Sequence, residues 1–475
     1  MTDKATAKIA GFATQIKYSD LPANVITEIK RVILDSIGCA FIGQTTDRGR
    51  IASEVSIKQG GAAQASIYGT DAKVSATGAA FANGEAMNAL DYDALSAAAV
   101  HDVAIIIPAM LALAESTNAS GKDLITAIAL GFELSARLKA AGAKIRLSDG
   151  SGELKWPSVL GYAAVTLAAA ASAGKLLRLN DGKIANAVAI AGGICPPNIF
   201  RKFTDTTPIG MIKYCATGWE AQTALSAAMM AESGYTGNTA LFSGDFGYYK
   251  YMGMGDITQE NVAELMSDLG SNWRSHQINY KQYPCCGHLS SVIDAFNDLI
   301  DKNSIAPEDI SEIVVHLDSI SQFRVFQENN LETPDDYCFS AAYIFACAAH
   351  RITRSYWHDE GTKQDANISK FMSDVKLELI SNKKIAGMSD KDGMADSNMT
   401  IAVTAKGATF TSDITYMRGS WEPAEYRCSD SELVAKFTDN TSRVLSTAQA
   451  QDAAKAIFEL DKADSISVIV KLLKT

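Results

Sequence analysis

The sequence predicts a mainly α-helical protein with a second, smaller α+β domain. Three observations carry this prediction: apolar residues recur at helical spacing through most of residues 1–276, β-branched residues cluster between 277 and 419, and a helical pattern returns after Gly419. A chain of 475 residues also exceeds the roughly 250 to 300 residues at which one hydrophobic core stops growing. We therefore predict a large, discontinuous all-helical domain formed by residues 1–276 and 420–475, with an α+β domain of residues 277–419 inserted into it.

Helices account for the first of these regions. In residues 22–42 apolar side chains recur every three or four positions, and Asp20 and Pro22 provide a start signal. The alanine-rich run from Gly161 to Ala173 is apolar nearly all round but shorter than the about 20 residues that span a bilayer, so we expect a buried helix in a bundle. The same spacing predicts helices over residues 103–116, 122–140, 160–175, 183–193, 218–234 and 259–268.

The second region mixes strands with helices, and the chain then ends in helices. Residues 311–319, 399–405 and 408–416 are expected to be strands, with a turn at Lys406-Gly407 between the last two, whereas 288–301 and 338–349 are expected to be helices. Residues 358–370 are polar and predict a loop. Ser429, with Glu432 three residues later, forms a capping-box pattern that predicts a further helix, and AQAQDAAKAIFEL and ISVIVKLLK follow it.

The balance of charges and the missing motifs exclude several classes of function. A net charge of −11 argues against a nucleic-acid partner, although a few lysines in one cleft can still bind a carboxylate. Without GxGxxG, P-loop, HExxH or GxSxG motifs in their required contexts, nucleotide cofactors and serine-hydrolase chemistry are disfavoured. The N-terminus has no signal-peptide pattern and nothing requires a membrane, so a cytoplasmic location is the default expectation.

The eight cysteines are too sparse for a disulfide framework. Most of them lie in apolar surroundings, so we expect them to be reduced and buried. Cys285 and Cys286, with His288 close by, are compatible with a metal site, but no CxxC pair elsewhere completes four ligands. We therefore predict no metal centre.

One short stretch provides a candidate acid–base group. Asp91 and Asp93 precede His101 by ten and eight residues, and apolar runs flank all three. A histidine titrates near neutral pH, and a nearby carboxylate can orient its ring and fix its tautomer, so His101 is the natural candidate for a general acid or base. The alternative is a hydrogen-bonded core histidine with two aspartates that form a turn at a helix end. Spacing alone does not separate the two interpretations.

Lysines provide candidate anion-binding groups. Lys213 precedes one predicted helix, and Lys281 lies in a polar and aromatic stretch that includes Tyr283. Each lysine could bind a carboxylate, or could equally be a solvated or snorkelling side chain. Lys155 and Trp156 lead into the alanine-rich helix and could line the same cleft. Otherwise they are a solvated loop lysine and a surface-packed tryptophan.

Several short motifs together resemble the MmgE/PrpD family, which includes 2-methylcitrate dehydratases, cis-aconitate decarboxylases and iminodisuccinate epimerases. The resemblance runs nearly from end to end of the chain. The motifs are LDSIGCAFIG (34–43), FANGEAMNALDYD (81–93), the later His101, GMIK ending at Lys213, GYTG (234–237), YKQYPCCGH (280–288) and SDSELVAKF (429–437).

The resemblance implies a large helical domain built from both chain ends with a smaller α+β lid, usually as a homodimer, without a metal or organic cofactor. It places the active site between the two domains, with Asp91, His101, Lys213 and Lys281 as the matching residues. The chain also departs from the family pattern. Asp93 is followed by Ala94 and Leu95 where many members have a sequence like DFDDT, and a pocket histidine before the alanine-rich helix is replaced around Lys155 and Trp156.

Family substrates share a small skeleton with two or three carboxylates. The resemblance therefore implies a cofactor-independent lyase that acts on an acid of the aconitate or methylcitrate type, and we favour decarboxylation over dehydration. The alternatives are an epimerase or racemase of an imino- or amino-dicarboxylate, and a non-catalytic ligand-binding member. We expect Lys213 and Lys281 to hold substrate carboxylates and His101, oriented by Asp91, to transfer a proton at carbon. Further substrate contacts are expected from Asp93, Lys155, Trp156 and Tyr283.

Overall fold

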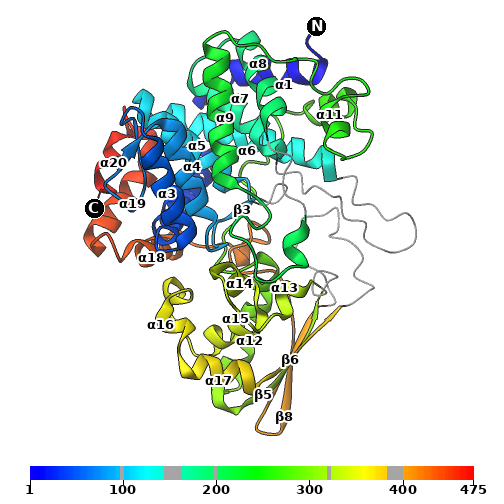
Figure 1. Cartoon of the computed structure of the whole chain (residues 1–475), viewed down its shortest axis with the longest axis vertical. Coiled ribbons are helices and arrows are strands. Elements are labelled where there is room, and N and C mark those ends of the chain that lie inside the picture. The colour runs from blue at the N-terminus through cyan, green and yellow to red at the C-terminus, as the bar shows by residue number, and fades with distance from the viewer. Residues whose placement is uncertain (97–100, 144–162, 196–200, 318–322, 382–398, 475) are drawn as a thin grey trace.

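The computed structural model describes residues 1–96, 101–143, 163–195, 201–317, 323–381 and 399–474. The predicted fold class is confirmed: the protein is mainly α-helical with a small α+β region (Figure 1). Helices fill the upper part of Figure 1, and the four-stranded sheet lies at the opposite end from the N-terminus. The boundaries near residues 276 and 419 remain our proposal for the limits of the second domain.

The upper part is a bundle built around α4 (Ala76–Asn88), α5 (Val103–Thr117) and α9 (Thr217–Glu232), which pack against one another. Alanines and glycines let these helices approach closely: Gly84 on α4 faces the backbone of Gly218 on α9, and a Cβ at either position would collide with the other helix. The bundle is completed by α2 (Ala23–Gly43), α6 (Gly121–Ala143), α7 (Ala163–Leu176), α8 (Asp181–Ile194) and α11 (Gln259–Leu265).

Each helix predicted in the first 276 residues is present. The described part of the alanine-rich segment forms α7, whose residues are almost all buried, as its apolar circumference predicts. Three further helices in this region were not predicted: α1 (Lys4–Gln15), α3 (Asp47–Gln59) and α4. The apolar periodicity of α3 and α4 is weak, whereas α1 is amphipathic and could have been found from its sequence. A short helix, α10 (Tyr248–Tyr251), and a small hairpin of β1 (Ala65–Ser66) and β2 (Lys73–Val74) are also present.

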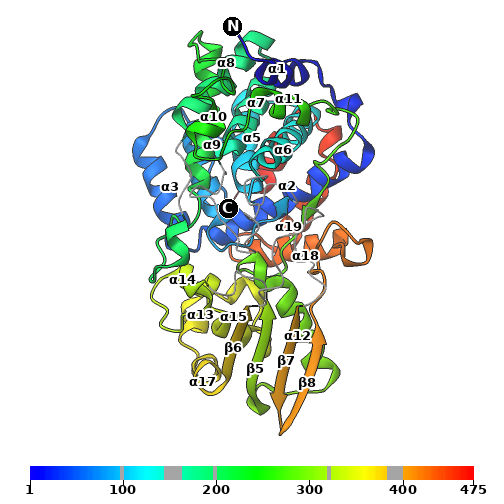
Figure 2. The same ribbon diagram turned by 90° about the vertical axis from the view of Figure 1, so that its right-hand side faces the viewer.

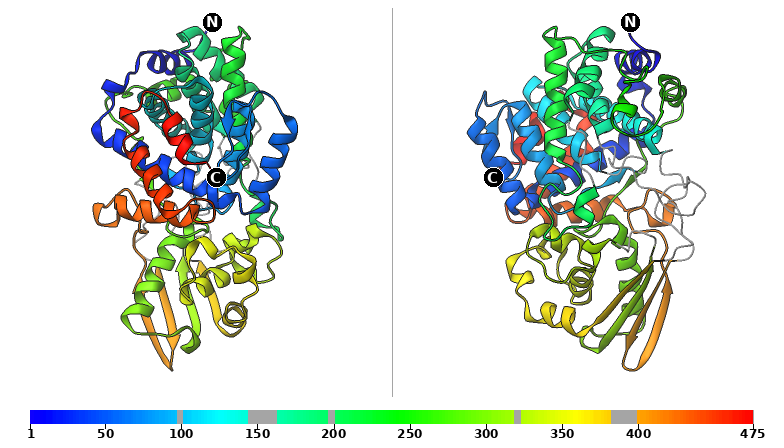
Figure 3. Two further views of the ribbon diagram at one scale, coloured as in Figure 1. Left: turned by 90° about the vertical axis from the view of Figure 1, so that its left-hand side faces the viewer. Right: turned by 45° about the vertical axis from the view of Figure 1, so that its right-hand side comes forward.

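The end of the chain returns to this bundle, as predicted. Ser429 caps α18 (Asp430–Thr441), and Glu432 completes the capping box. Both α18 and α19 (Thr447–Phe458) pack against α2, and α20 (Ser467–Leu472) packs on α19. Figure 3 shows these red and orange helices lying against the blue N-terminal ones. Segments from opposite ends of the sequence therefore share one core.

The α+β region contains one mixed four-stranded sheet. Figure 2 shows its strands side by side in the order β6-β5-β7-β8. The strands are β5 (Ile310–Leu317), β6 (Lys376–Ser381), β7 (Thr400–Ala405) and β8 (Ala408–Asp413). The predicted turn at Lys406-Gly407 joins β7 to β8, and both of its residues have positive φ, as a tight two-residue hairpin requires. The helix α12 (Ser290–Lys302) packs against β7 and β8.

Two predictions in this region are corrected. Residues 358–370 are not simply a loop, because α16 (Glu360–Lys363) lies within them and α17 (Ala366–Asp374) begins there. The helix predicted over 338–349 is instead two helices, α14 (Pro334–Phe339) and α15 (Ala341–Ala349), since Ser340 has an extended backbone and caps the second. Strand β6 was missed, although Leu377 and Leu379 alternate with polar residues. A short helix, α13 (Arg324–Gln327), precedes α14.

A two-stranded pairing brings the candidate site residues together. β3 (Leu95–Ser96), just after Asp93, pairs antiparallel with β4 (Ile278–Asn279), just before Lys281. The segments that carry Asp93 and Lys281 are therefore held side by side.

All eight cysteines are free and buried, as expected. Within the described ranges every helix is too short or too polar to cross a membrane.

Candidate active site

The acidic stretch folds into a tight turn at the end of α4. Asp91 lies in this turn with a φ of 53°, a left-handed conformation that a side chain other than glycine adopts at some cost in energy. Ligand atoms of Asp91, Asp93 and His101 all lie within 4.8 Å of one another, and the three side chains are buried. The structure thus brings together the three residues that sequence spacing singled out.

Both ring nitrogens of His101 face carboxylates. The Nδ1 atom lies 2.9 Å from Oδ2 of Asp93, and the Nε2 atom lies 3.4 Å from Oδ1 of Asp91. The closer contact is therefore made by Asp93, whereas the sequence analysis expects Asp91 to orient the ring. A hydrogen bond at Nδ1 fixes the orientation of the imidazole, so that Nε2 points to the side of Asp91.

A directed chain of hydrogen bonds supports these carboxylates. Arg48 on α3 donates to Oδ1 of Asn88 (3.1 Å), and Nδ2 of Asn88 donates to Oδ1 of Asp93 (3.0 Å) and to the hydroxyl of Tyr214 (2.7 Å). Tyr214 in turn donates to Oδ1 of Asp91 at 2.5 Å. Its ring is stacked on the His101 imidazole, with 4.6 Å between the ring centroids. Sequence reasoning missed Arg48, Asn88 and Tyr214.

We predict that Tyr214→Phe lowers kcat about tenfold or more, because a hydrogen bond to a charged group contributes about 1.5–3 kcal/mol and its loss leaves Asp91 less firmly held. The ring that stacks on His101 is retained, so the protein should remain folded. Steady-state kinetics and thermal melting measure the two effects. Tyr249→Phe is the matched control, since its buried hydroxyl bonds the carbonyl of Leu138 at 2.7 Å, and it should lower Tm without lowering kcat. Equal kcat values for the two variants would contradict the prediction.

The two candidate lysines clamp the same turn. Nζ of Lys213 donates to the carbonyl oxygens of Asn88 (2.9 Å) and Ala89 (3.3 Å), and Nζ of Lys281 donates to the carbonyl of Asp91 (2.5 Å). Lys281 also lies 3.2 Å from Oδ1 of Asp91. Both side chains are fully buried, and Lys213 has a φ of 46°. The turn thus lies beside both ammonium groups and the His101 imidazole, and in this structure the ammonium groups contact protein oxygens.

Opposite charges keep this buried cluster ionised. Burial alone would raise the pKa of Asp91, but Lys281, His101 and Lys213 outweigh burial and hold that pKa well below its usual range. The pKa of Asp93 is likewise lowered, because His101 outweighs the effect of burial. Burial tends to lower the pKa of Lys281, yet Asp91 and Asp93 raise it. The site therefore holds two carboxylates and an ammonium group in their charged forms, shielded from solvent.

The comparisons with known proteins agree with the resemblance. The model of the MmgE/PrpD N-terminal domain matches residues 7–260, and the model of the C-terminal domain matches residues 283–462. The chain belongs to the MmgE/PrpD family. Its N-terminal match contains Asp91, Asp93, His101 and Lys213, whereas Lys281 lies in the short segment between the two matches.

Three curated relatives of this MmgE/PrpD chain are named cis-aconitate decarboxylases. The Homo sapiens protein is 28% identical over 98% of this chain and 94% of its own length. The Mus musculus protein is 26% identical over 100% of this chain and 94% of its own length. The Aspergillus terreus protein is 28% identical over 62% of this chain and 60% of its own length.

Of the remaining predicted substrate contacts, the structure describes Tyr283, which lies away from the cluster around His101. The hydroxyl of Tyr283 donates to Oδ1 of Asp294 on α12 at 2.8 Å, and its ring stacks on Trp357, so its contacts lie within the α+β part of this MmgE/PrpD chain. These contacts do not favour the predicted role of Tyr283 in substrate binding. Lys155 and Trp156 lie outside the described residues.

Asp91, Asp93 and His101 are also ligand types that could hold a metal ion. However, Oδ1 of Asp91 already accepts from Tyr214 and lies beside the Lys281 ammonium, which would repel a cation. Cys285, Cys286 and His288 do not form a ligand group within the described ranges.

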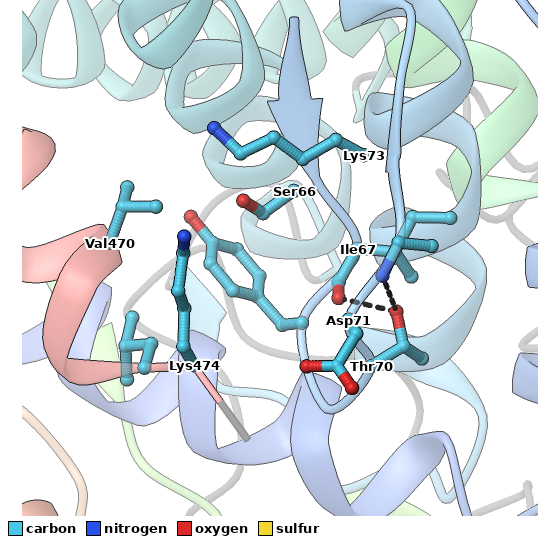
Figure 4. Close-up of a pocket in the computed structure, with 10 residues that line it drawn as sticks. Ser66, Ile67, Thr70, Asp71, Lys73, Val470 and Lys474 are labelled. Carbon is cyan, nitrogen blue, oxygen red and sulfur yellow. Dashed lines mark hydrogen bonds between the residues drawn. The ribbon is translucent and has the colours of Figure 1, made fainter. Parts of the chain in front are cut away.

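A separate pocket lies between the loop 66–73 and α20, outside this cluster (Figure 4). Ser66, Asp71, Lys73 and Lys474 contribute polar groups to its lining, and Lys73 is already paired with Glu115 at 2.7 Å. It contains none of the predicted site residues.

Proposed function

We propose that this chain is a cofactor-independent lyase that removes a carboxylate from a small polycarboxylic acid of the aconitate type. The observation that carries the proposal is the His101 imidazole, held at Nδ1 by Asp93 and facing Asp91 at Nε2, beside two buried ammonium groups. The names of the curated relatives support the same reaction class.

The chemistry follows from what such a site can stabilise. When the C–C bond to a carboxylate breaks, CO2 leaves and its bonding electrons move through the adjacent double bond. Negative charge then develops on carbon next to a remaining carboxylate, and a proton must be added there. His101 delivers that proton from Nε2 and is reprotonated by water, so one proton is consumed for each CO2 released. Asp93 positions the ring during this transfer.

The buried cations supply the electrostatic part of catalysis. Lys213 and Lys281 place positive charge next to the turn that carries Asp91, in surroundings shielded from water where that charge acts strongly. We propose that they stabilise the charge that develops as CO2 leaves and attract the remaining substrate carboxylates. Because both ammonium groups contact protein oxygens in this structure, substrate binding must replace some of these contacts.

The family resemblance extends the proposal to quaternary structure and location. We propose a cytoplasmic homodimer. Light scattering of the purified protein measures the dimer directly, since a monomer has a mass of 50.6 kDa.

Proton NMR in D2O with cis-aconitate, methylcitrate and iminodisuccinate tests the function. With cis-aconitate we expect CO2 loss and a five-carbon dicarboxylic acid carrying one deuterium on the methylene next to a carboxylate. Water loss from methylcitrate would instead favour a dehydratase, and deuterium exchange without loss of carbon would favour an epimerase. If no acid reacts while calorimetry detects binding, the chain is a ligand-binding member of the family.

A further inference from the structure

A carboxylate from the α+β part of the chain faces Lys213. Asp335, in the first turn of α14, places Oδ1 3.4 Å from Nζ of Lys213, and both side chains are buried. The neighbouring residue fixes this arrangement, because Oδ1 of Asp336 accepts from the backbone N–H of Ile209 at 2.8 Å. The loop that carries Lys213 is therefore docked on the start of α14.

Asp335 provides a second counter-charge for Lys213, in addition to that of Asp91. Two of the three ammonium protons of Lys213 point to the neutral carbonyls of Asn88 and Ala89. A buried ammonium group without an anion is strongly unfavourable, so something negatively charged must stand beside it. In this structure Asp335 makes the direct ion-pair contact, and Asp91 lies close enough to interact with the same ammonium group. A substrate carboxylate that binds Lys213 would serve the same purpose.

Asp335 itself is held poorly. Its separation of 3.4 Å from Lys213 exceeds the 2.7–2.9 Å of a charge-assisted hydrogen bond, and Oδ1 makes no hydrogen bond to the residues that the structure describes. Burial raises the pKa of Asp335 to about 6 although Lys213 and Arg48 lower it, and Asp91 adds to the rise. The facing titratable groups are these three and Cys338 on the same helix. A carboxylate so weakly held is one that a better anion can displace.

We propose that Asp335 is a specificity-determining residue, which occupies the position of a substrate carboxylate at Lys213 and so disfavours acids with an additional carboxylate. This inference rests on the proposed function, because it assumes that polycarboxylic acids bind here. In this structure Asp335 pairs with Lys213. An acid with a carboxylate for Lys213 must move Asp335 aside or bind together with a proton that neutralises it, whereas an acid without that carboxylate leaves the pair intact.

Two unreactive acids that differ by one carboxylate test the proposal. Tricarballylate is glutarate with an added central carboxylate, and calorimetry can measure both affinities for wild type and Asp335→Asn. Two like charges brought together in a binding site typically weaken binding by several kcal/mol, which corresponds to more than a tenfold change in affinity. We expect Asp335→Asn to bind tricarballylate about tenfold more tightly than wild type at about pH 7.5, and glutarate with less than about a threefold change.

The pH dependence sharpens the test. A raised pKa means that wild-type Asp335 is charged well above pH 6 and neutral well below it, whereas asparagine is neutral throughout. The advantage of Asp335→Asn for tricarballylate should therefore shrink at about pH 5, one unit below the wild-type pKa. Each comparison is made at a single pH, so protonation of the ligand affects both proteins equally.

Controls separate this effect from a general change in charge. Asp294→Asn removes another buried carboxylate of the α+β part, one that contacts Tyr283 and the backbone of Arg418, and should leave the ratio of the two affinities unchanged. Asp335→Ser provides a second neutral variant should asparagine impair folding, which thermal melting reveals. Equal tricarballylate affinities for wild type and both neutral variants would overturn the inference and leave the proposed function intact. Failure of both acids to bind any of the proteins would overturn both.

Discussion

His101→Asn is expected to lower kcat for decarboxylation by a factor of about 10² to 10⁴ while the protein remains folded, because a positioned acid–base group contributes about that much. The asparagine amide can still donate to Asp93, as Nδ1 of His101 does, so the buried carboxylate keeps a partner. No group then remains at the position of Nε2. The variant should therefore still bind substrate while proton delivery fails.

Single-turnover measurements of CO2 release and calorimetric binding of tricarballylate separate these two effects. His350→Asn is the matched control, since the ring of His350 contacts Phe371 at the end of α15 and should leave kcat within about twofold. Near-normal turnover by His101→Asn would refute the proton-transfer role of His101. An equal loss in the control would point to a general effect on folding.

Lys436→Met is expected to destabilise the protein by about 3–5 kcal/mol, the typical cost of removing one partner from a buried ion pair. Lys436 on α18 lies 2.7 Å from Oδ1 of Asp35 on α2, and both are buried. The methionine would leave the Asp35 carboxylate without its counter-charge. Because a domain is stabilised by only about 5–15 kcal/mol in total, urea unfolding should detect the loss readily.

The same lysine also bears on catalysis. It donates to the carbonyl oxygen of Tyr92 (3.0 Å), which follows Asp91 in the turn, and to that of Lys281 (2.9 Å), whose ammonium group contacts the turn. Combining Lys436→Met with Asp35→Leu removes both charges and should restore most of the stability, but kcat should stay low because the two carbonyls still lack their donor. A double variant that recovers stability and kcat together would show that Lys436 acts on the fold alone. A single variant that costs less than about 1 kcal/mol would contradict the ion-pair argument.

Much of the fold could be predicted because it depends on local patterns. Apolar spacing located α2, α5 and α9, and the Ser429 capping box located α18. Some errors arose where tertiary packing, and not the local pattern, determines whether a segment is helical. The sequence of α4 consists mostly of small residues with little apolar periodicity, so its helix depends on burial against its neighbours.

The candidate site divides in the same way. Asp91, Asp93 and His101 lie within eleven residues, so their proximity could be predicted from the sequence. Lys213 and Lys281 were placed by resemblance to the family. Asn88, Tyr214 and Asp335 gave no separate signal, since their roles depend on contacts between segments far apart in the chain.

The pairing of α2 with α18 has a consequence for biosynthesis. An ion pair joins Arg31 to Asp430, 399 residues later, and Asp35 pairs with Lys436, which also lies about 400 residues further along the chain. A chain emerging from the ribosome can therefore cover the face of α2 fully only after residues 430–458, which form α18 and α19, have been synthesised. Nascent intermediates must keep that face exposed, which makes them substrates for chaperones and prone to aggregation.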